Sequence, residues 1–155
     1  MAQTLNGVFL ANYSVDVGQW RHVQGNYNFT DDTGAQAAYT IFTVSGDVML
    51  YVIGICQVSL TTGGGAATIE LGIAGNTAAL IAQTTGTELD QYETWQDASP
   101  EANPGAVDSS ASSTKVIANG VDVILTIATA DLTAGDIDFH AFWLPLSTDG
   151  ALVAV

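Results

Sequence analysis

The sequence alternates between short runs rich in Thr, Val and Ile and clusters of Gly, Asn and Ser that end each run. The helix formers Lys, Arg and Glu are scarce, so the local preferences favour strands over helices. A parallel sheet needs crossover helices, which this pattern does not supply. The sequence therefore predicts an all-β fold, an antiparallel β-sandwich or jelly roll of about seven or eight short strands. The expected strands cover residues 39–44, 47–58, 68–73, 79–84, 114–118, 121–128 and 136–144.

The dipeptide Asn119-Gly120 is the clearest turn signal in the chain. Both central residues of a type I′ turn need a positive φ, which Asn and Gly adopt most easily. This predicts a hairpin between residues 114–118 and 121–128. We expect residues 136–144 to be the last strand, ending at Pro145, which has no N–H to give to a ladder.

The expected strand 47–58 is apolar on both faces. Tyr51 and Ile53 lie on one face, whereas Leu50 and its even-numbered neighbours lie on the other. A strand of an ordinary sandwich buries one face and exposes the other to water. Either a segment of this chain, for which residues 1–38 are available, or a neighbouring subunit should cover the second face.

Residues 1–38 differ from the rest because Asn and Gly alternate there with aromatic residues. We expect them to form an extended N-terminal arm with aromatic anchors, followed by a sandwich or jelly-roll domain over 39–155. Trp95 lies beside polar residues and before a long loop over 96–113, so it is a candidate for an exposed contact, whereas Trp143 is expected in the core. The candidate interface residues are Phe9, Tyr13, Trp20, Arg21, Tyr27, Phe29, Tyr51 and Trp95.

The charge is strongly negative, with 2 basic and 16 acidic residues and a net charge of -14. Nucleic acids and anionic membranes repel such a surface, so neither is an expected partner. Only 12% of the residues are charged while 48% are hydrophobic. Much of the surface is therefore uncharged, which favours contacts with other subunits or partners over a monomer with a Thr-, Ser-, Asn- and Gly-rich exterior.

No motif for catalysis, metal binding or a cofactor is evident. The chain lacks a nucleophile elbow, and its two histidines stand in no recognisable arrangement. The acidic residues between 88 and 101 and between 131 and 138 are interpreted as a solvated rim, although a Ca²⁺ site or a glycosidase pair is an alternative. Cys56 is expected to be a buried thiol. No signal peptide and no membrane-spanning run are expected, so we expect synthesis in a cytoplasm.

Five segments, 41–48, 71–77, 80–84, 117–120 and 142–147, form a pattern of hairpins over residues 40–150 or so. Together they resemble small all-β structural proteins of tailed bacteriophages.

The resemblance implies a capsid decoration (cement) protein, typically a homotrimer that binds the major capsid protein on the outside of the shell. Such a protein is a non-enzymatic virion component that is made in the host cytoplasm. It must stay soluble before assembly and adhere afterwards, which suits a chain of high negative charge with a wide uncharged surface. The alternatives are a tail or fibre adhesin or a carbohydrate-binding module that uses Trp95 and the loop 96–113, and a carboxylate-based hydrolase.

Overall fold

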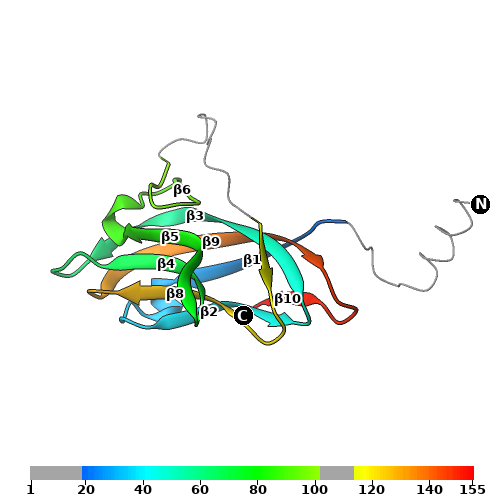
Figure 1. The fold of residues 1–155 in the computed structure, drawn as a ribbon. Coiled ribbons are helices and arrows are strands. Elements are labelled where there is room, and N and C mark those ends of the chain that lie inside the picture. The colour runs from blue at the N-terminus through cyan, green and yellow to red at the C-terminus, as the bar shows by residue number, and fades with distance from the viewer. Residues whose placement is uncertain (1–18, 102–113) are drawn as a thin grey trace, which may run out of the picture.

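The computed structural model describes residues 19–101 and 114–155. These residues form two antiparallel sheets that pack face to face (Figure 1). The first sheet has the order β1-β9-β3-β6, with β7 also paired to β3, and the second has the order β10-β2-β8-β4-β5. The strands are β1 (Arg21–Asn28), β2 (Ala38–Ser45), β3 (Val48–Thr62), β4 (Thr68–Ile73), β5 (Asn76–Thr85), β6 (Thr94–Trp95), β7 (Lys115–Ile117), β8 (Val123–Ala128), β9 (Leu132–Pro145) and β10 (Ala151–Ala154). The helical segments among the described residues are α2 (Phe29–Asp32) and the 3₁₀ turn η1 (Gly86–Glu88).

The prediction of an all-β sandwich is confirmed. Inward side chains alternate with outward ones along the central strands, as the period of two in the sequence predicts. In β9, Phe139 and Trp143 point into the core, and in β8, Leu125 does so from the opposite sheet. No helix in the described part of the chain is long and apolar enough to cross a membrane.

The expected arm is different in the structure, because β1 is an integral strand of the first sheet. All eight of its residues pair with β9, from Arg21 opposite Trp143 to Asn28 opposite Asp136. Gly25 lets β1 lie close to the second sheet, since a Cβ there would be 2.7 Å from Ile41 Cγ2. Residues 19–38 thus belong to the sandwich, and residues 1–18 lie outside the described residues.

The hairpin expected at Asn119-Gly120 is wrong. The strands on either side belong to different sheets, since β7 pairs with β3 and β8 pairs with β2 and β4. Gly120 alone of the two has a positive φ, 73°. The side chain of Asn119 accepts a hydrogen bond from the Gly46 N–H (3.0 Å), and its backbone N–H donates to Asp47 Oδ1 (3.1 Å). The dipeptide therefore connects the two sheets and ties this connection to the turn between β2 and β3.

The expectation that residues 136–144 form the last strand is also wrong. After Pro145 the chain turns and adds β10 to the edge of the second sheet, opposite β2. The turn is held by Ser147, whose Oγ accepts from the Asp47 N–H (2.8 Å) and donates to Asp149 Oδ1 (2.7 Å). That hydrogen bond lowers the pKa of Asp149.

Cys56 is buried, as predicted, and its thiol donates to the backbone oxygen of Val58 (3.2 Å). Burial, followed by the negative charges of Glu93 and Asp90, raises the thiol pKa from 9.0 to about 12. Tyr27 is also buried, and its hydroxyl donates to the backbone oxygen of Thr33 (2.9 Å). Burial again is the main cause that raises the pKa of Tyr27 above its usual value of 10.0.

These two groups should make the fold sensitive to alkali. Above pH 9 the unfolded chain releases the Cys56 proton while the folded chain keeps it, so the free energy of unfolding should fall as the pH rises. The slope for one group approaches about 1.4 kcal/mol per pH unit. Urea unfolding between pH 7 and pH 11 measures it. Cys56→Ala should flatten the curve between pH 9 and pH 10 and leave the decline that Tyr27 causes at higher pH; an identical curve for wild type and variant would contradict this origin.

Candidate functional site

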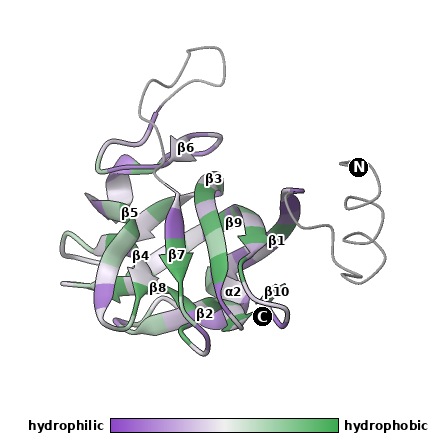
Figure 2. Cartoon of the chain, turned by 45° about the vertical axis from the view of Figure 1, so that its right-hand side comes forward, coloured by the Kyte–Doolittle hydropathy of each residue, from purple (hydrophilic) through white to green (hydrophobic). Residues whose placement is uncertain are grey.

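The outer face of the first sheet is apolar along β3 and at the end of β9, with polar side chains along β1, and Figure 2 shows hydrophobic colouring along β3 and β9. Its side chains alternate with those that point into the core. The antiparallel register aligns them in rows across the sheet. We call this surface the aromatic face. Its members are His22, Gln24 and Asn26 on β1, Asp138, His140, Phe142 and Leu144 on β9, and Met49, Tyr51, Ile53 and Ile55 on β3.

One row of rings crosses the middle of the aromatic face. Tyr51 and Phe142 are opposite each other and stack, with ring centroids 5.0 Å apart and planes 13° apart. His22 lies on the other side of Phe142, at 5.0 Å. Trp20, which is 48% exposed, meets Tyr51 edge-on at 5.7 Å. Because Tyr51 and Phe142 stack across the strands, these two rings present their edges, and not their faces, away from the sheet.

The aromatic face is apolar at one end and acidic at the other. At the apolar end, Met49 is opposite Leu144, and Val116 of β7 extends the surface and is 65% exposed. At the acidic end, the side-chain amide of Asn26 donates to Asp138 Oδ1 (3.0 Å) and to Asp136 Oδ1 (2.6 Å). The carboxylates are thus fixed by an amide and lie apart from the row of rings.

The outer face of the second sheet differs in chemistry. Thr40 and Thr43 of β2 are exposed, and Glu70 of β4 is half-buried beside Gln83, whose amide donates to it (3.3 Å). Ile124 of β8 and Val153 of β10, which is 56% exposed opposite Thr43, are apolar outward residues on this side, and no ring contact is found there among the described residues. The described surface therefore has one aromatic sheet face and one that is mostly small and polar.

The segment expected to cover the second face of strand 47–58 does not do so in the described residues. β1 lies beside β9 in the same sheet and not over β3 (Figure 1). Trp20 is the residue from this segment that contacts Tyr51. The other cover that the sequence indicates for this face of the strand is a neighbouring subunit.

The structure brings some of the predicted interface residues together and separates others. Trp20 and Tyr51 meet on the aromatic face. The guanidinium of Arg21 points the other way and lies over the ring of Trp143, 5.1 Å from its centroid, a cation–π contact. Phe29 lies in α2 and is half-buried. The predicted anchors Phe9 and Tyr13 lie outside the described residues.

Two predicted contact residues are core residues. Tyr27 is fully buried because it is on the inward side of β1. Trp95 is also fully buried, so the expectation of an exposed ring is wrong. β6 pairs with β3 at Gly54, and the missing side chain there leaves room for the indole, which also lies 6.3 Å from the ring of Phe139. The glycan-binding alternative depended on an exposed Trp95 and loses that support.

Sequence reasoning placed His140 on the outward face of its strand, but it missed Phe142 and His22 as parts of the surface. Alternation along β9 places Phe142 and His140 on the same side as Asp138, which the pattern contains. The pairing of β1 with β9 is not visible in the sequence, so His22 could not be placed beside them.

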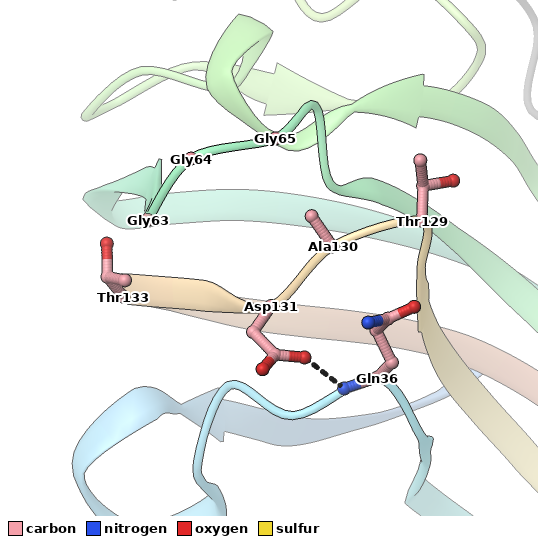
Figure 3. A pocket seen from close by; sticks show the side chains of 8 residues that line it. All are labelled: Gln36, Gly63, Gly64, Gly65, Thr129, Ala130, Asp131 and Thr133. Atoms are coloured by element: carbon pink, nitrogen blue, oxygen red, sulfur yellow. Dashed lines mark hydrogen bonds between the residues drawn. The ribbon is translucent and has the colours of Figure 1, made fainter.

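A shallow pocket of about 500 Å³ lies at one end of the sandwich (Figure 3). Asp131 is its ionisable side chain, and its Oδ1 accepts a hydrogen bond from the backbone N–H of Gln36 (3.0 Å). A second acid or base needed for hydrolysis is not among the lining residues. Among residues 19–101 and 114–155, no group of three or more His, Cys, Asp or Glu side chains could hold a metal ion. The lining residues are Gln36, Gly63, Gly64, Gly65, Thr129, Ala130, Asp131 and Thr133.

No protein-family model and no curated protein matches the chain. Solved structures that are similar to it include the acidic stable capsid of Helicobacter pylori bacteriophage KHP30 (TM-score 0.44, 11% identity, 90% of this chain and 96% of that chain). Another is the capsid asymmetric unit of cyanophage Pam1 (TM-score 0.45, 14% identity, 84% of this chain and 87% of that chain). A third is the Bacillus endospore appendages, described as disulfide-linked pili (TM-score 0.32, 18% identity, 82% of this chain and 88% of that chain). With TM-scores below 0.5, these likenesses do not establish a shared function.

Proposed function

We propose that this chain is a non-enzymatic structural component of a bacteriophage virion, a capsid decoration protein that binds the outer shell as an oligomer. The proposed partners are other copies of the chain, as a homotrimer, and the major capsid protein. The segments that resemble small all-β phage structural proteins indicate the class of particle. The aromatic face supports a function by adhesion.

The observation that carries the proposal is the row formed by His22, Phe142 and Tyr51, with Trp20 beside it. Aromatic residues are enriched in the buried cores of protein–protein interfaces, and charged residues are depleted there. The row crosses three strands whose backbones are hydrogen-bonded to one another, so the surface is held rigid before it meets a partner. A preformed surface loses little conformational entropy on binding.

The charge distribution suits the same function. A net charge of -14 per chain disfavours non-specific aggregation of the free oligomers in solution. The carboxylates Asp136 and Asp138 lie at one end of the aromatic face, so repulsion does not prevent contact at the row of rings. The expected partner surface is apolar and uncharged opposite the rings and rich in hydrogen-bond donors or cations opposite the acidic end.

The experiment that tests the proposal uses virions of the phage that encodes the chain. Purified virions should contain the chain in a fixed ratio to the major capsid protein. Particles made without it should take up the purified protein until the shell sites are saturated, as measured by co-sedimentation, and cryo-electron microscopy should locate it on the shell. Light scattering of the free protein should give three times the chain mass of 16.0 kDa. Its absence from virions, or its location on the tail, would contradict the decoration role.

A further inference from the structure

The two histidines of the chain, 118 residues apart in sequence, lie beside each other on the aromatic face. His22 Nε2 of β1 is 3.0 Å from His140 Nδ1 of β9. The ring planes differ by 15°, and the ring centroids are 5.2 Å apart. Since the nitrogens are much closer than the centroids, the rings lie almost edge to edge, and one nitrogen donates a hydrogen bond to the other.

We infer that His22 and His140 form a binding site for a divalent transition-metal ion of the class that imidazole prefers, Zn²⁺, Ni²⁺ or Cu²⁺. In a tetrahedral zinc site with Zn–N bonds of about 2.0–2.1 Å, two ligand nitrogens are about 3.3 Å apart. The observed spacing of 3.0 Å needs to open by only a few tenths of an ångström. The ion would replace the proton that the two nitrogens share, and each ring would turn by about 35° so that its lone pair points at the ion and not at the other nitrogen.

The surroundings leave room for an ion and favour a positive charge. His22 is exposed and His140 is half-buried, so an ion can approach from solvent. The chain as a whole carries a charge of -14, which attracts cations. Asp138 is two residues before His140 on the same side of β9, and its carboxylate lowers the cost of a positive charge nearby.

With two protein ligands, the remaining coordination positions are open. Water would fill them in the free protein, and a side chain of a bound partner could replace that water. The site is in this respect unlike a closed structural zinc site, which has four protein ligands. We therefore expect moderate affinity and no dependence of the fold on the metal. The inference concerns the free chain and stands apart from the proposed function.

The test is a calorimetric titration of the purified full chain with ZnCl₂ at pH 7.5. Wild type should bind one Zn²⁺ per chain, and His22→Gln and His140→Gln should each weaken binding by at least about tenfold. Gln24→Ala is the matched control, since Gln24 is opposite His140 on the same surface and should not change the affinity. The Cu²⁺-loaded wild type should show two nitrogen ligands by electron paramagnetic resonance and each variant fewer.

Three results would overturn the inference. One is a wild-type chain that does not bind Zn²⁺. Another is binding that persists unchanged in either histidine variant, which would assign the ion to surface carboxylates. The third is equal loss in Gln24→Ala, which would assign the effect to the fold of β1. Circular dichroism of all three variants separates a loss of ligand from a loss of structure.

Discussion

Trp95→Ala should destabilise the fold by about 3–5 kcal/mol, the range measured when a buried Trp or Phe is truncated to alanine. Trp95 is fully buried, and its indole fills the space above Gly54 and beside Phe139. Gly54 has no side chain that could move into the cavity, so the surroundings cannot collapse easily. Urea unfolding, followed by circular dichroism, measures the loss.

Trp95→Phe is the informative control. The indole Nε1–H is buried and has no hydrogen-bond partner among the described residues. An unpaired buried donor costs about 1–3 kcal/mol, and phenylalanine removes this cost while it keeps most of the ring. We expect Trp95→Phe to be less destabilising by at least about 2 kcal/mol than Trp95→Ala. Equal losses for the two variants would show that the indole N–H has a partner.

Tyr51→Asp should abolish binding to capsid particles if the aromatic face is the docking surface. Tyr51 is central, because it stacks on Phe142 and meets Trp20. Truncation of a central aromatic residue typically costs 2 kcal/mol or more, about a 30-fold loss of affinity, and a charge placed in a dry contact costs further. The add-back assay with particles made without the chain measures the affinity.

Thr40→Asp is the matched control for this prediction. It adds the same charge on an exposed position of a strand, but on the outer face of the second sheet. We expect its particle binding to stay within about threefold of wild type, since surface substitutions away from a contact usually change the free energy by less than about 0.5 kcal/mol. If Thr40→Asp abolishes binding and Tyr51→Asp does not, the second sheet is the docking surface.

The fold class was predictable because it depends on a local property, the alternation of apolar and polar residues. Strand 68–73 of the sequence prediction coincides with β4, and 39–44 lies within β2. β1 was not predicted because five polar residues and Gly25 weaken its pattern. Its membership in the sheet depends on pairing with β9, more than one hundred residues away.

The candidate site was predictable in part for the same reason. Tyr51 was identified from a strand that is apolar on both faces. Trp95 was misplaced because its neighbours in sequence, Thr94 and Gln96, are polar, whereas its burial depends on Gly54, which only the fold brings beneath it. Asn119 was misplaced because its side chain bonds to a turn that is distant in sequence. Local patterns thus predict which face a side chain occupies within a long alternating strand, but not which strand lies next to it.

The position of β9 between β1 and β3 determines when the protein can fold during its synthesis. β1 and β3 are translated well before β9, the strand that joins them, which spans Leu132–Pro145. Until then, both strands have unpaired backbone edges, and β3 is apolar on both sides, a combination prone to aggregation. Pairings of such large sequence separation form slowly. A product truncated before β9 would therefore expose the backbone edges of β1 and β3 that β9 pairs with in the folded sheet.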